Sequence, residues 1–184
     1  MRSRSAAALF ALLAAASLAG CAGGAAERSE PSTGAAPPET GDPAAFAQAE
    51  EWLEAAALPP GAVRSDASAG EFLSFTGWPC TPVEELEGFW TIPDATVADT
   101  ANWLLANPTA DLTTTAVGPY PDDPALDNLT VGYIPADGAQ EGVVYTVVRT
   151  PDGVAVRAEV AALTEAAACP ELPDGGTLGP PGQG

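Results

Sequence analysis

The chain of 184 residues carries 25 acidic residues against six arginines and no lysine, and its formal charge of −19 excludes nucleic acid as a partner because it repels phosphate backbones. The absence of both histidine and lysine excludes imidazole bases, imidazole metal ligands, Schiff-base nucleophiles and P-loop lysines. The 19 glycines and 19 prolines, together with abundant alanine, predict unpacked stretches around one modest domain.

The N-terminus has the parts of a bacterial secretory signal in the right order. Arg2 and Arg4 form a basic region, and residues 6–18 form an apolar run too short to span a bilayer. The run ends in Leu-Ala-Gly-Cys at positions 18–21, which resembles the lipobox of bacterial lipoproteins. That resemblance implies cleavage immediately before Cys21 and lipidation of its sulfur through a thioether, with palmitate among the acyl chains.

The membrane is therefore the first expected partner, reached through the lipid on Cys21. A chain this acidic gains nothing electrostatically from an anionic leaflet. Two or three acyl chains, at about 0.8 kcal/mol per buried CH₂, give a stable anchor where one does not. The expected location is the outer face of the cytoplasmic membrane, in the cell envelope.

Four segments follow from the composition. Residues 1–20 are the expected lipoprotein signal peptide. Residues 21–42 comprise the lipidated cysteine and a tether with no side chain large enough to form a core, so disorder is expected. Residues 43–169 form the expected globular domain, and residues 170–184 repeat the Pro/Gly bias of a disordered tail.

The first expected helix begins at Pro43, with Asp42 as its cap, and ends at residues 58–61 (Leu-Pro-Pro-Gly). The residues expected on its buried face are Phe46, Leu53 and Ala57.

A second helix is expected from a cap at Thr96, with Asp99 three residues later, to the Asn-Pro stop at 107–108. The residues expected on its buried face are Val97, Ala101, Leu104 and Leu105.

The remaining domain sequence reads as strands. Residues 89–92 and 112–117 flank the second helix and predict a compact β-α-β stretch. Residues 129–134, 143–149 and 154–160 are rich in β-branched side chains and are separated by turn sequences, which predicts an antiparallel meander. The expected class is α+β, with two helices packed on a mainly antiparallel sheet of about five strands in a single small domain.

Cys80 and Cys169 are the two cysteines left after lipidation. In an exported domain such a pair is most simply a disulfide. The alternative, a redox or nucleophilic cysteine, lacks both a C-x-x-C motif and a histidine to activate the thiol.

Two acidic clusters contain residue types that occur in metal-binding or catalytic sites. Asp122, Asp123 and Asp127 offer oxygen ligands for Ca²⁺, but their spacing matches no calcium loop, and a solvated turn is the favoured interpretation. Glu84, Glu85 and Glu87 (the 84–87 cluster) contain the two carboxylates that a glycoside hydrolase needs, yet a charged surface connection is commoner. No metal, cofactor or catalytic residue is predicted.

The aromatic residues leave two interpretations open. Trp52, Trp78, Trp90 and Trp103 either belong to the core or line a ligand groove for sugars or lipids.

The lack of lysine and the abundance of alanine, glycine and proline resemble exported proteins from GC-rich genomes, such as those of actinobacteria. Over residues 43–169 the chain is similar to small actinobacterial lipoproteins of uncharacterised function, through Leu-Pro-Pro-Gly-Ala-Val at 58–63, Gly-Phe-Trp-Thr-Ile-Pro at 88–93 and the helix after it. The resemblance implies no known activity for this chain.

The sequence therefore predicts a lipid-anchored envelope lipoprotein with a non-enzymatic binding or scaffold domain. The alternatives are a substrate-capturing lipoprotein of a transporter and a carboxylate-dependent hydrolase. An enclosed aromatic pocket would favour the binder, and converging acids would favour the enzyme.

Overall fold

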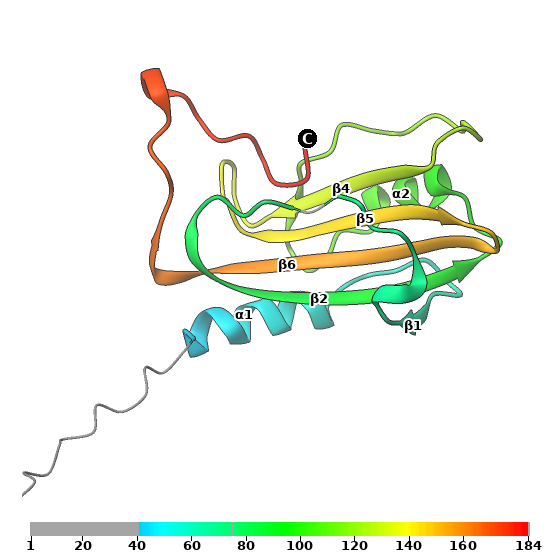
Figure 1. Cartoon of the computed structure of the whole chain (residues 1–184), viewed down its shortest axis with the longest axis horizontal. Helices are drawn as coiled ribbons and strands as arrows, with labels where there is room; N and C mark the ends of the chain where they lie inside the picture. Colours follow the sequence, from blue (N-terminus) through cyan, green and yellow to red (C-terminus); the bar gives the residue numbers. More distant parts are fainter. Residues whose placement is uncertain (1–40, 75, 184) are drawn as a thin grey trace, which may run out of the picture. The chain divides into compact units, whose positions relative to one another are not determined.

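The computed structural model describes residues 41–74 and 76–183, all within one compact unit that spans residues 39–184 (Figure 1). The expected signal peptide, Cys21 and the expected tether up to residue 40 lie outside the described residues. The elements in chain order are α1 (Pro43–Glu54), β1 (Val63–Ser65), the 3₁₀ helix η1 (Ala67–Ala69), β2 (Thr81–Pro93), α2 (Val97–Ala106), β3 (Thr113–Thr114), β4 (Asn128–Ile134), β5 (Gly142–Thr150), β6 (Gly153–Ala168) and the 3₁₀ helix η2 (Pro173–Gly175).

The strands form one antiparallel sheet in the order β1-β2-β6-β5-β4-β3. The α+β class is confirmed, with six strands where about five were expected. The meander of β4, β5 and β6 is also confirmed, and Gly153 (φ 146°) closes its second turn. Between the two ends of the described chain, no helix is both long and apolar enough to cross a membrane.

The expected compact β-α-β stretch is wrong. β2 and β3 flank α2 in sequence, but β6, β5 and β4 lie between them in the sheet. β3 is also only two residues long, where a strand over 112–117 was expected. The reason is that β2 pairs along its whole length with β6, a contact between segments far apart in sequence that no local pattern signals.

Both helix starts are confirmed. The Asp42 carboxylate accepts hydrogen bonds from the backbone N–H groups of Ala44 and Ala45, at 2.9 and 3.3 Å. The Thr96 hydroxyl accepts from the Asp99 N–H at 3.1 Å. These bonds satisfy N–H groups that have no partner inside the helix. A further bond, from the backbone N–H of Glu165, contributes most to lowering the pKa of the Asp42 carboxyl.

The buried face of α1 differs from the expected one. Ala45, Ala49 and Trp52 are buried, whereas Phe46 is 41% exposed and Ala57 lies beyond the end of the helix. The stripe therefore consists of small residues at one-turn spacing, which let the helix approach the sheet closely, and a single large side chain. α2 buries Val97, Ala101 and Leu104 as expected, whereas Leu105 is only partly buried.

Both helices pack on the same face of the sheet, α1 over β2 and β6 and α2 over β4 and β5. The strand residues of this core alternate along each strand, as a pleated sheet requires. They are Trp90 and Ile92 of β2, Val131 and Tyr133 of β4, Val143, Tyr145 and Val147 of β5, and Val154, Val156, Ala158, Val160 and Ala162 of β6. The intervening residues of these strands point to the opposite face.

The sequence predicts a surface connection at the glutamates 84–87, but in the structure they lie within β2. β1 covers β2 only at residues 89–91, so one edge of β2 is unpaired along the acidic stretch. Charged side chains on such an edge oppose pairing with another chain. The acidic run thus marks an exposed strand edge.

Candidate functional site

The sheet face opposite the helices is covered by two segments without regular strands. One is the β1–β2 loop, described over residues 66–74 and 76–80, and the other is the C-terminal strap, residues 176–183. The strap, red in Figure 1, belongs to the segment 170–184, for which the sequence predicts disorder. In the structure it lies against β4. A groove runs between these two coverings.

A buried ion pair holds the β1–β2 loop to the sheet. Arg157 and Glu159 lie two residues apart on β6, joined at 2.8 Å, with side chains 3% and 8% exposed. The Glu159 carboxylate accepts from the Thr76 backbone N–H and from the Thr76 hydroxyl, both at 3.1 Å. The Arg157 guanidinium donates to the Ser74 carbonyl. The two charges are thereby satisfied by each other and by the loop backbone, as buried charges require.

Close packing adds to this attachment. A Cβ atom on Gly70 would lie 2.7 Å from Val148 and 2.9 Å from Ala155, so only glycine lets the loop lie this flat on the sheet. Phe72 follows, with its ring centroid 5.8 Å from that of Phe89. The Arg157 guanidinium also lies over the Phe72 ring, at 5.2 Å.

The far end of the loop is fixed covalently. Cys80 and Cys169 form a disulfide, as the sequence predicts, and it joins the loop to the segment after β6. Cys80 is fully buried and Cys169 is exposed. This wall of the groove is therefore held at its middle by the ion pair and at its end by the disulfide.

The C-terminal strap forms the other wall. The Gln140 side chain donates to the Gly179 carbonyl at 3.2 Å, and the Thr130 hydroxyl donates to the Gly182 carbonyl at 2.7 Å. Between them, Pro181 is buried over Gly132 of β4, where an added Cβ would lie 2.4 Å from the Pro181 oxygen. The strap thus runs antiparallel to β4, from its C-terminal end toward Thr130.

Two cavities lie along the groove and share Ser74 and Asn128 in their linings. The first, of about 840 Å³, lies between the start of the β1–β2 loop and the end of β5, around Val148. The second, of about 450 Å³, lies between Thr76 and the strap, around Thr146.

Hydroxyl, amide and apolar groups line most of the groove. Thr146 and Val148 project from β5 into it, and Leu73, 88% exposed, stands in the lining of the larger cavity. The charges near the larger cavity include Asp127 and Arg149, which pair at 3.3 Å. Such a surface suits a ligand that offers polar main-chain groups and some apolar area.

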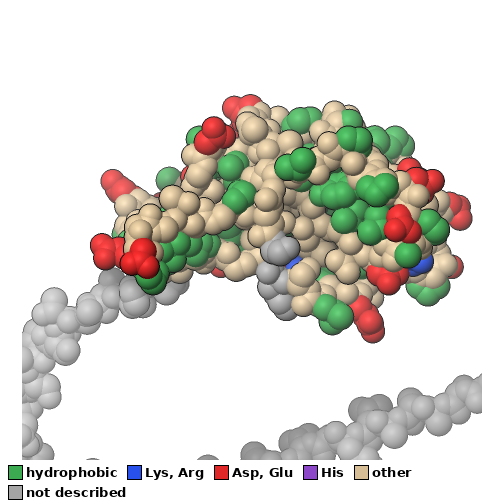
Figure 2. All heavy atoms as spheres, turned by 90° about the horizontal axis from the view of Figure 1, so that it is seen from above, with side chains coloured by type: hydrophobic (Ala, Val, Ile, Leu, Met, Phe, Trp, Pro, Cys, Tyr) green, Lys and Arg blue, Asp and Glu red, His purple; other side chains and the backbone are tan. Residues whose placement is uncertain are grey.

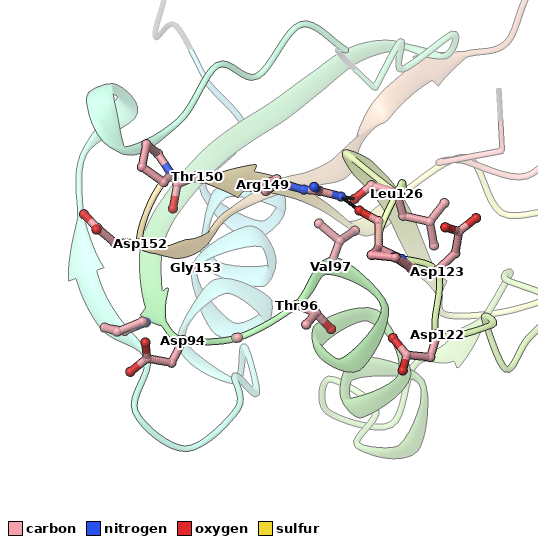
Figure 3. A pocket seen from close by; sticks show the side chains of 14 residues that line it. Asp94, Thr96, Val97, Asp122, Asp123, Leu126, Arg149, Thr150, Asp152 and Gly153 are labelled. Atoms are coloured by element: carbon pink, nitrogen blue, oxygen red, sulfur yellow. Dashed lines mark hydrogen bonds between the residues drawn. The ribbon is translucent and has the colours of Figure 1, made fainter.

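A third cavity, of about 560 Å³, lies at the start of α2 and brings together four of the acidic residues (Figure 3). Asp122 and Asp123 lie on the opposite side of it from Asp94 and Asp152. Arg149 points instead toward Leu126, whose carbonyl it bonds at 2.5 Å. The carboxylates do not converge.

The other acidic candidates are also separated. Glu84 bonds the backbone N–H of Asp42 at 2.8 Å, whereas Glu85 and Glu87 point to the other face of β2. In the part of the chain that the structure describes, no three acidic or cysteine side chains lie close enough to hold a metal ion. Seen from above, acidic side chains recur around the molecule and basic ones are sparse (Figure 2).

The four tryptophans do not share a groove. Trp52 and Trp90 are buried in the core on the helix side, and Trp103 packs against that core. The guanidinium of Arg64 lies over the Trp90 ring at 4.2 Å. Trp78 lies in the β1–β2 loop, is half-buried and does not belong to that core. The core interpretation therefore holds for three of the four.

The tyrosines are core residues with altered acidity. Burial raises the pKa of Tyr133 to about 12 and raises the pKa of Tyr145 and of Tyr120 above the usual value. The Tyr133 hydroxyl donates to the Leu104 carbonyl of α2, and the Tyr145 hydroxyl bonds the Thr109 hydroxyl. The phenols of Tyr133 and Tyr145 stay neutral at physiological pH and fasten α2 and its following turn to the sheet.

The groove was not predicted from the sequence. One signal was present: Arg157 and Glu159 are the only charges in the strand 154–160, at alternate positions, which indicates a polar site on one face of a strand that is buried on both. No local pattern marks Thr130, Thr146 or Gln140, because their role depends on which coil segments come to lie above them.

Searches of protein-family models, of curated proteins and of solved structures found no match to this chain.

Proposed function

We propose that this protein is a bacterial lipoprotein, held at the outer face of the cytoplasmic membrane by acyl chains on Cys21, whose domain binds or scaffolds a partner in the cell envelope without catalysing a reaction. The observation that carries the binding role is the groove between the β1–β2 loop and the C-terminal strap. Both walls are fixed to a rigid sheet, so the groove is formed before a ligand arrives, and a preformed site costs less to occupy.

The proposal of a non-enzymatic role draws on the chemistry of the same surface. Groups such as Thr146, Thr130 and Gln140 offer hydrogen bonds but do not exchange protons near neutral pH. The carboxylates around the cavity at α2 lie apart, whereas carboxylate catalysis needs two that converge.

The anchor is tested by substitution of Cys21. Cys21→Ala removes the only sulfur in the motif at 18–21, so the acyl chains cannot be attached. We expect the parent protein in the membrane fraction and the variant released from it, because an acidic domain has no electrostatic attraction to anionic lipid. Cell fractionation with immunoblotting measures this. Equal membrane retention of the variant would remove the anchor from the proposal.

The binding role is tested with a photo-crosslinking amino acid in intact cells. Placed at Leu73, beside the groove, it should give a discrete adduct of higher mass. Placed at Phe46, exposed on α1 on the other side of the sheet, it should give none. Adducts are detected by immunoblotting and identified by mass spectrometry. The same adducts from both positions, or none from Leu73, would show that the groove is not a contact surface.

A further inference from the structure

Three polar residues form one cross-strand row on the floor of the groove. Thr130 of β4 pairs with Thr146 of β5, which pairs in turn with Arg157 of β6. The Thr130 hydroxyl donates to the Gly182 carbonyl of the strap, and the Arg157 guanidinium bonds the β1–β2 loop. Thr146 lies between them and is only 1% exposed, yet among the described residues its hydroxyl has no hydrogen-bond partner. Because a buried polar group without a partner is costly, a hydroxyl of this kind in the lining of a cavity indicates a place for a polar group of a ligand.

The cavity at Thr146 is uncharged. It is the one of about 450 Å³, and none of the described residues that line it carries a charge, although the formal charge of the chain is −19. Ser74 and Asn128 connect it to the larger cavity, and in the described part of the chain their side chains also make no hydrogen bond. Hydroxyl and amide groups both donate and accept. The cavity therefore suits a neutral ligand whose own polar groups do the same.

This groove lacks the features by which proteins recognise peptides. Those features are an open sheet edge, an apolar groove for a helix, an aromatic groove for a proline-rich segment and an arginine cluster for acidic groups. The floor here is a sheet face, whose strands use their backbone groups to bind one another. The described lining of the two cavities includes no aromatic residue, and its one arginine, Arg149, is paired with Asp127. Short hydroxyl and amide side chains remain for recognition, and these match the hydroxyl groups of sugars more closely than they match main-chain amides.

Apolar side chains supply the other half of a sugar site. Pro79 of the loop and Pro180 of the strap line the smaller cavity from its two walls. Val148 and the exposed Leu73 line the larger one. The C–H faces of sugar rings gain apolar contact on such residues. Both cavities have volumes within the range of about 300–1,000 Å³ that is usual for ligand sites, and they share part of their lining, so a chain of sugar units can extend from one to the other.

We propose that the groove binds a neutral polysaccharide of the cell envelope, with one sugar unit seated over Thr146 and the next units extending toward Val148. This inference rests on the proposed binding function of the groove and names its ligand class. The Thr146 hydroxyl bonds a sugar hydroxyl at the floor, and Ser74 and Asn128 bond the adjoining unit where the cavities meet. The acidic domain repels acidic polysaccharides, so neutral ones are selected.

The experiment titrates the Cys21→Ala chain with soluble ligands and follows its backbone amide signals by NMR. The probes are neutral hexasaccharides of glucose, mannose, galactose and N-acetylglucosamine, the acidic hexasaccharide of galacturonic acid, and an uncharged hexapeptide of alanine and serine with blocked ends. We expect at least one neutral hexasaccharide to bind with a Kd of about 1 mM or less and to shift the signals of Thr146 and Asn128. The acidic hexasaccharide should bind at least about tenfold more weakly, because the acidic domain repels it.

Matched variants locate the binding. Thr146→Val removes the hydroxyl at nearly constant volume and should weaken the binding of that hexasaccharide about fivefold to tenfold. The melting temperature of this variant should stay the same or rise, because the hydroxyl it removes has no described partner in the protein. Thr91→Val is the control, since Thr91 is half-buried on the same sheet face but lines neither cavity, and binding should not change. Asn128→Ala, at an exposed position, should weaken binding to a similar extent and decides the question if Thr146→Val does not fold.

Four results would overturn the inference. They are no shift of groove signals with any neutral hexasaccharide up to about 10 mM, equal binding of the acidic hexasaccharide, unchanged binding by folded Thr146→Val or Asn128→Ala, and tighter binding of the peptide than of every oligosaccharide. The last result would identify a protein segment as the ligand.

The crosslink at Leu73 separates failure of this inference from failure of the proposed function. With a polysaccharide ligand, the adduct should contain sugar, and the hexasaccharide that binds should compete with its formation. An adduct that contains only protein and that no oligosaccharide reduces would leave the groove as a binding site for a partner of another class. The absence of any adduct would remove the binding role itself.

Discussion

Loss of the Cys80–Cys169 disulfide is expected to lower the free energy of unfolding by about 4–5 kcal/mol. The two cysteines are 89 residues apart, and a cross-link that closes so long a loop removes much of the conformational entropy of the unfolded chain. For a domain of this size the melting temperature should fall by about 10–20 °C. Because domains have only about 5–15 kcal/mol of stability, the loss is a large fraction of the total.

The measurement is urea unfolding of the Cys21→Ala protein, in which two cysteines remain, with and without reductant. Cys169 is exposed, so reductant reaches the bond without prior unfolding. The double variant Cys80→Ala/Cys169→Ala should match the reduced protein and should not respond to reductant. Two freely alkylated thiols in the native protein, or unfolding midpoints that do not change, would contradict the structure.

Breaking the buried Arg157–Glu159 pair is expected to cost about 3–5 kcal/mol for either single substitution. Arg157→Met leaves the Glu159 carboxylate buried without its cation, and Glu159→Leu leaves the guanidinium without its anion. The double variant should cost less than the sum of the two single variants, by about 1.5–3 kcal/mol, because neither charge is then unbalanced.

The exposed pair of Arg149 and Asp127 is the matched control. Its side chains are 45% and 78% exposed, so Asp127→Asn should cost less than about 1 kcal/mol. Urea unfolding of all four variants gives the comparison. Hydrogen exchange should also show faster exchange at the Thr76 N–H in any variant that lacks Glu159, since its acceptor is gone. Similar costs for the buried and exposed pairs would show that the ion pair does not hold the loop.

The two structural predictions bear on the same wall of the groove. The ion pair fixes the β1–β2 loop at Ser74 and Thr76, and the disulfide fixes it at Cys80. A variant that keeps the sheet but frees this loop should therefore lose the crosslinked adduct at Leu73 while remaining folded. Stability and partner binding are coupled in this molecule through one segment.

Sequence alone determined the features whose causes are local. The caps at Asp42 and Thr96 are set by side chains that bond N–H groups two or three residues away. The meander of β4, β5 and β6 follows from β-branched runs joined by turn residues. For such features the energy depends on neighbours in the chain, so the pattern carries the information. The disulfide joins cysteines 89 residues apart and was predicted for another reason, that only two cysteines remain in a domain expected to be exported.

Only the tertiary structure decided the features that depend on distant partners. The glutamates at 84–87 lie in a strand because β2 pairs with β6, whose residues opposite them come some seventy or more positions later in the sequence. The groove exists because Arg157 and Glu159 bind backbone groups of the β1–β2 loop and because Gly132 admits the carbonyl of Pro181. A coil segment has no periodic pattern of its own, and the free energy that places it comes entirely from the surface on which it lies.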